Sequence, residues 1–367
     1  MKYVLPLIVC SLLLSCKPAD KKSLSPKLEA GKLSVDLPGT KLNNAFPGIE
    51  LLLGPGETPL AWFPSEKTVL TEKERETPQG KARDFSMTWK HPEGYALTWI
   101  ISELHDNPGI TVRSTFTNNS GQPLRLRNFV LLKTSQEGLV CEGNPASWWL
   151  LPSMEYGRQA GNLAQVFPSR KRLREQRVYG YDDIDTLDQR NTDGHWRFHE
   201  ELVTLYNDVD RKGITMGAVG PGVSHVSFNS RVDKGNILLE ILSQMDEILV
   251  DPGETRESEE VLILAKPYKE ALDNMVSWIA ETHQARLKNK PVFGWCSWYD
   301  RYENIDEEHI LNVIKASNDL KVNIPMDVIQ IDYGWSIAMG DWTANKKFPG
   351  GMKYLADKIK ETGAVPG

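Results

Sequence analysis

The fold is decided by residues 291–335, which read PVFGWCSWYDRYENIDEEHILNVIKASNDLKVNIPMDVIQIDYGW. Their pattern predicts a strand at residues 292–295 and then a helix at residues 306–320, whose acidic first turn suits a helix N-terminus. A second strand is predicted at residues 327–332, an almost continuous apolar run that is typical of a strand covered on both faces. Strand, helix and strand in this order predict a parallel sheet with right-handed crossovers.

The same alternation continues to the end of the chain. Apolar residues recur at helical spacing between positions 352 and 359, Gly363 stands where a C-terminal cap is expected, and Ala364 and Val365 would start a third strand. We therefore predict the start of a (β/α)8 barrel, about two of its eight units. Because two parallel strands cannot close a barrel of about 250 residues, we expect the chain to be the N-terminal part of a longer protein.

Upstream of this region, residues 31–266 show short β-type runs between clusters of Gly, Pro, Asn and Asp. The clearest predicted strands are residues 95–103, 110–117, 124–132, 225–232, 237–242 and 260–264. Such spacing indicates a large antiparallel β-sandwich. A helical pattern after Pro267, with a charged tail, predicts a linker helix at residues 267–290, so the truncated barrel domain would span residues 291–367.

The N-terminus is typical of an export signal. Residues 1–15 carry one early Lys and an apolar stretch that is too short to span a bilayer. Residues 13–16 read Leu-Leu-Ser-Cys and resemble a bacterial lipobox, so we expect lipid on Cys16 and a lipidated tether at residues 16–30. The protein would then be an exported lipoprotein anchored to a membrane on its periplasmic or cell-surface side. Cleavage by ordinary signal peptidase, with Cys16 incidental, is the alternative.

The composition of the chain limits which classes of partner the protein is expected to bind. A net charge of −6 with no long Lys/Arg run argues against a nucleic-acid partner. The 11 Trp and 11 Tyr include rings that can stack on sugars, although most are expected in the core. Two of the four Cys lie in the signal region, which leaves Cys141 and Cys296 either bridged or as two separately buried thiols.

Candidate binding residues lie where the two parallel strands end, because βα barrels place their reacting groups at the C-terminal ends of strands. Asp332 ends the second strand, and Trp295 and Trp298 lie at the end of the first. A carboxylate can accept charge-assisted hydrogen bonds from two sugar hydroxyls, while an indole supplies an apolar wall. The alternative is that Asp332 binds loop backbone amides and that the Trp residues only pack.

Four motifs in this region carry a family resemblance. They are FGWCSWY at residues 293–299, IQIDYGW at 329–335, GDW at 340–342 and KFPGGMK at 347–353. In this order they resemble glycoside hydrolase family 36, of the α-galactosidase type in clan D. The motifs cover about residues 291–367, and the upstream half agrees in architecture only. The resemblance implies a large N-terminal β-sandwich, a (β/α)8 catalytic barrel and a small C-terminal β domain.

The implied activity is that of a retaining α-galactosidase, which cleaves terminal α-galactosyl residues from oligosaccharides or glycans without a metal or organic cofactor. Its nucleophile and acid/base, carboxyls about 5–5.5 Å apart, would lie on the fourth and sixth strands, beyond Gly367, so we assign no catalytic residue and expect the fragment to be inactive. Asp332 matches the first Asp of the family's Asp-Asp-Gly-Trp segment, which holds galactose hydroxyls. The expected substrate-binding residues are Asp332, Tyr333, Trp335, Asp341, Trp342, Trp295 and Trp298.

One residue departs from the family pattern. Tyr333 stands where the second Asp is usual, so a neutral phenol replaces a charged acceptor and strict galactose recognition becomes a question. Two other functions stay open. One is galactosyl transfer, as in raffinose synthases, and the other is a non-catalytic surface lipoprotein that binds glycans.

Three other patterns have simpler interpretations. His195 and His199 are four residues apart, but their segment lacks a helical stripe for a metal pair. The acidic cluster at residues 182–188 lacks the turn Gly and the closing Glu of an EF-hand, which favours a solvated loop. Residues 217–222 are rich in Gly, but Pro221 interrupts them and no helix follows, so we expect a β-turn cluster rather than a nucleotide loop.

Overall fold

The computed structural model describes residues 26–52, 58–135, 138–144, 147–152, 161–162, 197–233, 236–287, 290–320 and 325–367. The chain divides into two compact units at Ala285 and Arg286. The predicted signal peptide, Cys16, the acidic cluster at 182–188 and His195 lie outside the described residues. Among the residues described, no helix combines the length and apolar character needed to cross a membrane.

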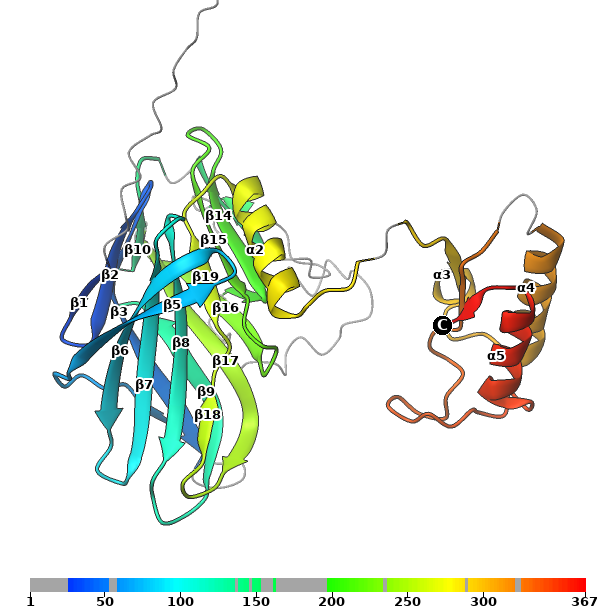
Figure 1. Cartoon of the computed structure of the whole chain (residues 1–367), viewed down its shortest axis with the longest axis horizontal. Coiled ribbons are helices and arrows are strands. Elements are labelled where there is room, and N and C mark those ends of the chain that lie inside the picture. Colours follow the sequence, from blue (N-terminus) through cyan, green and yellow to red (C-terminus); the bar gives the residue numbers. More distant parts are fainter. Residues whose placement is uncertain are drawn as a thin grey trace, which may run out of the picture. The chain divides into compact units, whose positions relative to one another are not determined.

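The first unit is a β-sandwich of two antiparallel sheets (Figure 1). The first sheet has the order β1 (Lys27–Glu29), β2 (Lys32–Leu37), β3 (Thr40–Leu52), β10 (Leu139–Cys141), β17 (Asn236–Val250), β16 (His225–Asp233) and β13 (Arg197–Glu200). Two further strands pair with it, β4 (Leu60–Trp62) with β3, and β9 (Leu124–Lys133) with both β17 and β3.

The second sheet has the order β12 (Gly161–Asn162), β11 (Trp148–Pro152), β14 (Leu202–Asn207), β15 (Gly213–Ala218), β19 (Val261–Leu264), β8 (Gly109–Asn118), β7 (Tyr95–Leu104), β6 (Gly80–Lys90) and β5 (Leu70–Thr77). The short strand β18 (Thr255–Glu257) pairs with β8. The predicted antiparallel sandwich is confirmed.

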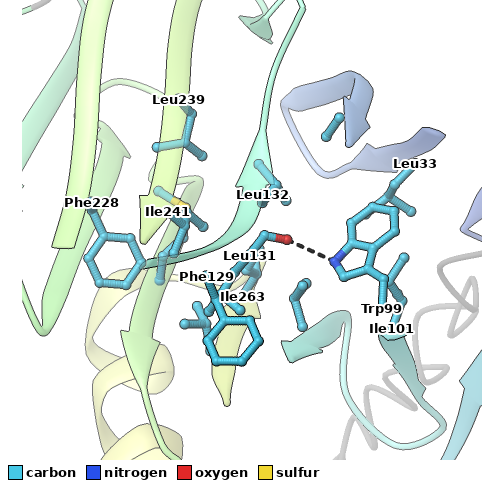
Figure 2. Close-up of a cluster of buried hydrophobic side chains, with 14 of the residues drawn as sticks. Leu33, Trp99, Ile101, Phe129, Leu131, Leu132, Phe228, Leu239, Ile241 and Ile263 are labelled. Atoms are coloured by element: carbon cyan, nitrogen blue, oxygen red, sulfur yellow. Dashed lines mark hydrogen bonds between the residues drawn. The ribbon is translucent and has the colours of Figure 1, made fainter. Parts of the chain in front are cut away.

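The inner faces of the two sheets share one apolar core. Alternate residues of β7 turn inward, so Leu97, Trp99 and Ile101 are fully buried. The indole Nε1 of Trp99 donates a hydrogen bond of 2.8 Å to the backbone carbonyl of Leu131 on β9, and Figure 2 shows this bond within the core. The bond satisfies a buried donor and links a strand of one sheet to a strand of the other.

The predicted strands agree closely with the observed ones, with one instructive difference. The sequence predicts a strand at residues 237–242, whereas β17 runs over Asn236–Val250. Its pairing with β9 shifts between Gln244 and Ile248, where Asp246 and Glu247 have positive φ angles of 50° and 59°. This bulge takes up the polar residues that break the apolar alternation, and the strand then resumes its ladder.

Helix α2 (Tyr268–Thr282) covers part of the outer face of the second sheet, as Figure 1 shows. Its buried residues Ala271, Met275 and Trp278 form an apolar cluster with residues of the sheet that include Leu104 and Leu262. The apolar face of the helix therefore packs on the sandwich, which explains its helical periodicity.

Beside this apolar cluster, the second sheet carries a partly buried network of charges. Arg75 Nε donates to Asp84 Oδ1 at 3.1 Å, and Arg113 Nη2 donates to Asp84 Oδ2 at 2.7 Å. Arg75 also pairs with Glu260. Two carboxylates therefore share two guanidinium groups, so each buried charge has partners of opposite sign.

The second unit contains a three-stranded parallel sheet in the order β20 (Gly294–Cys296), β21 (Val328–Gln330) and β22 (Val365–Pro366). Helices α3 (Trp298–Arg301) and α4 (Glu307–Leu320) connect the first two strands, and α5 (Gly351–Glu361) connects the last two. The strand order follows the chain order, as in the wall of a barrel. The unit thus has the predicted architecture, two βα units and the first residues of a third strand.

Both of the first two strands are shorter than predicted. Ahead of the ladder, Phe293 N donates to Asp327 Oδ2 at 3.0 Å, and Asp327 N donates to Phe293 O at 2.7 Å. These bonds tie the two chain segments together through a side chain, so regular pairing begins only at Gly294 and Val328.

In this chain the second strand is covered on one face among the described residues, as expected of a sheet that does not close. Ile329 and Ile331 are buried in a core that they share with α4 and α5. Gln330, which alternates with them, points to the opposite face and is exposed. Both long helices pack on one face of the sheet, and Gln330, the one polar residue of β21, lies on the other.

Candidate functional site

A buried serine joins the ends of the first two parallel strands. Ser297, which is fully buried, follows β20, and its backbone amide donates to the carbonyl of Gln330 at 3.1 Å. Its hydroxyl in turn accepts a hydrogen bond of 2.8 Å from the backbone amide of Asp332. The position of Asp332 at the C-terminal end of β21 is therefore fixed by the neighbouring strand.

The carboxylate of Asp332 is oriented by three donors. Oδ1 accepts from the backbone amide of Tyr333 at 2.7 Å. Oδ2 accepts from Gln330 Nε2 at 3.0 Å and lies 3.4 Å from the thiol Sγ of Cys296, which donates to it. The backbone contact is the kind that the alternative interpretation expected, but two side chains also hold this half-buried group. Such a preoriented carboxylate is suited to recognise hydroxyl groups.

The thiol of Cys296 is a donor in this cluster. Burial raises its pKa, and the nearby Asp332 carboxylate raises it further. The protonated form is therefore favoured, which lets the thiol donate to Asp332 rather than repel it.

Two of the predicted aromatic residues, Trp298 and Tyr333, lie close to each other. The Trp298 ring centroid is 6.5 Å from that of Tyr333, the residue that follows Asp332. Trp298 also contacts Tyr302 edge to face at 5.3 Å. These rings form an aromatic border beside the polar cluster.

Trp295 lies on the other side of the sheet. It pairs in register with Ile329, packs against the apolar core, and has its ring centroid 6.0 Å from that of His309 on α4. The structure therefore does not bring Trp295 to the face that carries Gln330 and Asp332, and its surroundings are those of a packing residue.

The remaining predicted residues lie on the loop after β21. The Trp335 and Trp342 rings are 6.0 Å apart, and Trp342 is 86% exposed. Asp341 accepts a hydrogen bond of 2.7 Å from the backbone amide of Thr343, and hydrogen bonds from the side chain and backbone of Thr343 lower its pKa. Asp341 thus holds the turn of this loop, which presents Trp342 to solvent.

The same loop is braced from within. Asn345 Nδ2 donates to the carbonyls of Gly334 at 2.9 Å and Ser336 at 3.0 Å, and Ser336 and Ala344 form an isolated β-bridge. The loop therefore has a defined conformation of its own, which holds Trp335 and Trp342 in a fixed relation.

Sequence reasoning missed three residues of this site, Cys296, Ser297 and Gln330. All three lie within the quoted motifs, and the sequence carried a signal for one of them. Gln330 alternates with Ile329 and Ile331 and so shares a face with Asp332. The pairing of Cys296 with Gln330 depends on the register of the two strands, which only the structure gives.

The other candidate sites have structural roles. His199 is buried on strand β13 and not on a helix. The backbone amides of Val223 and Ser224, which follow the Gly-rich turn, donate to the carboxylate of buried Glu259, so this loop binds the chain's own anion. The structure describes no cluster of three or more His, Cys, Asp or Glu residues that could hold a metal within the ranges given above.

Cys141, in the first unit, and Cys296, in the second, are each a partly buried free thiol in this structure. Burial raises the pKa of Cys141 to about 12. Neither thiol is therefore a reactive thiolate at neutral pH.

No protein-family model matches the chain. Among solved structures it is similar to α-galactosidases, some of which are named as members of glycoside hydrolase family 36. These include AgaA from Geobacillus stearothermophilus, with 16% identity and a TM-score of 0.48 over 94% of this chain and 45% of that one. TtGalA from Thermus thermophilus shows 17% identity and a TM-score of 0.40 over 81% of this chain and 48% of that one. An α-galactosidase from Lactobacillus brevis shows 13% identity and a TM-score of 0.48 over 93% and 44%. The chain thus spans less than half the length of these three structures.

Proposed function

We propose that this chain supplies part of the sugar-binding site of a retaining, α-galactosidase-like glycoside hydrolase. The observation that carries the proposal is the carboxylate of Asp332, held at the C-terminal end of a parallel strand by Gln330, Cys296 and Tyr333. In a βα architecture this end of the sheet is where substrates bind.

The chemistry of the cluster fits a neutral, hydroxyl-rich ligand. Asp332 is an ionised acceptor whose hydrogen bonds with hydroxyl groups are charge-assisted. The rings of Trp298 and Tyr333 supply an apolar border against which the C–H face of a sugar can pack. A terminal α-galactosyl residue of an oligosaccharide or glycan is the substrate we propose.

In the proposed reaction two further carboxyl groups act on the glycosidic bond. One attacks the anomeric carbon and the other protonates the leaving oxygen, which yields a covalent glycosyl intermediate that water hydrolyses with overall retention. Asp332 takes neither role in this scheme. It binds hydroxyl groups of the sugar and positions the ring, so that its contribution is orientation of the reacting centre.

Tyr333 bears on which sugar the proposed site recognises. It replaces a carboxylate by a phenol that is 38% exposed, so the sugar recognised at this site must be determined by experiment. Galactosyl transfer to a sugar acceptor would use the same binding residues and differ in how water is excluded.

We also propose that the protein is exported and anchored to a membrane through a lipid on Cys16. The support is the short apolar segment followed by Leu13, Leu14, Ser15 and Cys16. Such an anchor would place the enzyme where exogenous glycans reach it.

The test uses the full-length gene product that contains this chain. Purified protein is assayed with aryl α-galactoside, aryl N-acetyl-α-galactosaminide and aryl β-galactoside, and NMR follows the first anomer released from the best substrate. The proposal expects cleavage of the α-galactoside with initial release of α-galactose. Initial release of the β anomer would contradict retention, and activity on the β-galactoside alone would contradict the substrate class.

A second assay separates hydrolysis from transfer. The α-galactoside is incubated with and without an excess of a disaccharide acceptor, and free galactose is compared with the new trisaccharide. Dominance of free galactose supports the hydrolase, whereas dominance of trisaccharide at modest acceptor concentration supports the transferase.

A further inference from the structure

We propose that Gln330 is a further sugar-contacting and positioning residue, whose amide nitrogen fixes Asp332 while its amide oxygen accepts a sugar hydroxyl. The inference rests on the proposed function, because it names a second ligand of the same sugar. It assigns a role to a residue outside the substrate-binding set that the motifs imply.

The sheet places Gln330 on the face that carries the polar cluster. Ile329 and Ile331 are buried against the helices, so the alternating residue Gln330 points away from them. Its register partner on β20 is Cys296, and both side chains reach the same oxygen of Asp332. Three polar groups therefore converge at the C-terminal edge of two strands.

The hydrogen bond to Asp332 determines which end of the amide is presented. A carboxylate accepts only, so the NH2 end of Gln330 must face it, and Nε2 lies 3.0 Å from Oδ2. The amide oxygen Oε1, at the other end of the same group, therefore points away from Asp332 Oδ2 and is an oriented acceptor. Gln330 is exposed among the residues that the structure describes.

The number of hydrogen bonds that Asp332 can still accept also supports a sugar contact at Gln330. Oδ2 receives Gln330 Nε2 and Cys296 Sγ, and Oδ1 receives the backbone amide of Tyr333. An oxygen of a carboxylate has about two lone-pair sites, so Oδ1 keeps one acceptor site for a sugar hydroxyl. Gln330 Oε1 supplies a second acceptor beside it, and the two together match two neighbouring hydroxyls on one ring.

The replacement of a carboxylate by Tyr333 offers a reason why Gln330 Oε1 would act as a second acceptor. In the family that the motifs resemble, a second carboxylate stands at this position, whereas the phenol here offers one neutral donor or acceptor. Gln330 Oε1 would supply a neutral acceptor in its place.

The experiment compares two variants of the full-length gene product. Gln330→Met keeps the length of the side chain and removes both hydrogen-bonding ends. Gln330→Glu keeps the acceptor and places a second carboxyl against Asp332, where like charges disfavour the doubly ionised state. Gln244→Met on β17 of the sandwich is the matched control, and thermal unfolding is measured for all proteins.

We expect Gln330→Met to lower kcat/KM for the aryl α-galactoside by about 10- to 100-fold, mainly through KM, with a melting temperature close to that of Gln244→Met. For Gln330→Glu, one shared proton restores the hydrogen bond at acidic pH. Its kcat/KM relative to wild type should therefore fall steadily as the pH rises from about 5 to 8. A ratio independent of pH would mean that the side chain at position 330 does not act on Asp332 when substrate binds.

Equilibrium binding of galactose, followed by NMR, separates this proposal from the proposed function. One possible result is that the wild type binds galactose without hydrolysing α-galactosides and that Gln330→Met abolishes this binding. The proposed hydrolase function would then be wrong, whereas the role of Gln330 in sugar binding would be supported. If the wild type is active and Gln330→Met matches Gln244→Met in KM and in galactose affinity, the Gln330 assignment is overturned. A wild type that neither cleaves nor binds galactosides overturns both.

Discussion

The backbone amide of Asp332 donates a 2.8 Å hydrogen bond to the hydroxyl of Ser297, which is fully buried. Removing that acceptor in Ser297→Ala leaves the amide without its partner, at a cost of about 1–3 kcal/mol. We expect the variant to lose about tenfold or more in kcat/KM on an α-galactoside, because the carboxylate shifts with its backbone. Ser277→Ala, at an exposed position of α2, is the control, and equal behaviour of the two variants would refute a positioning role for Ser297.

Gly334 is held in a conformation that other residues rarely adopt. Its φ angle is +114°, and a Cβ atom there would lie 2.6 Å from the carbonyl oxygen of Glu303. Gly334→Ala should therefore lower the free energy of unfolding of the second unit by about 1–3 kcal/mol, measured by urea unfolding. At Gly340, φ is +79° but a Cβ atom would meet no neighbour within 4 Å, so Gly340→Ala should cost less. A larger loss at Gly340 would show that crowding by Glu303 is unimportant.

The charge network of the sandwich predicts a specific response to acid. Burial alone would raise the pKa of Asp84, but the hydroxyl of Ser102 and the guanidinium groups of Arg113 and Arg75 outweigh it, so the pKa is lowered. An unfolded Asp titrates near pH ~3.9. The stabilisation is therefore complete above that pH and is lost as the pH falls through the lower, folded-state pKa.

Arg113→Met should make this acid-induced loss of stability smaller, because the folded-state pKa of Asp84 then lies closer to its unfolded value. The measurement is the free energy of unfolding from urea titrations between about pH 2 and 6. Arg286→Met, at an exposed position, provides the control. An unchanged slope in Arg113→Met would mean that this guanidinium does not stabilise the ionised Asp84.

Lipid attachment to Cys16 is tested by labelling. Cells that express the full-length gene product are grown with a radiolabelled or alkyne-bearing fatty acid, and membrane and soluble fractions are separated. The wild type should carry label and sediment with membranes, whereas Cys16→Ser should lose both. Cys10→Ser, within the same apolar segment, should behave as the wild type, and labelling that persists in Cys16→Ser would locate the lipid elsewhere.

The sequence predicted the architecture because its periodicities are unambiguous. The stripe that includes Ile310 and Ile314 fixed a helix, and the alternation at residues 110–117 fixed strand β8. The bulge in β17 was not predictable, since an interruption of alternation by Gln244–Glu247 is equally compatible with a turn. Whether the strand resumes depends on pairing with β9, a contact that no local pattern contains.

The sequence predicted only that the site lies at the ends of the two strands. Asp332 followed from its place after an apolar run, but its bonds to Gln330 and Ser297 depend on rotamers and on a neighbour 35 residues away. The packing position of Trp295 follows from register, because it pairs with the buried Ile329. Register between parallel strands is set by the crossover helix, so the sequence could not decide which Trp would accompany Asp332.

The central claim, that Asp332 contacts the sugar, is tested most directly by kcat/KM of Asp332→Ala in the full-length gene product. Asp319→Ala, at the exposed end of α4, serves as the control for folding and expression. We expect Asp332→Ala to lose about 10³-fold or more in kcat/KM for an aryl α-galactoside, because an ionised hydrogen-bonding group that positions the ring is removed. A kcat/KM equal to that of the wild type and Asp319→Ala would contradict the assignment.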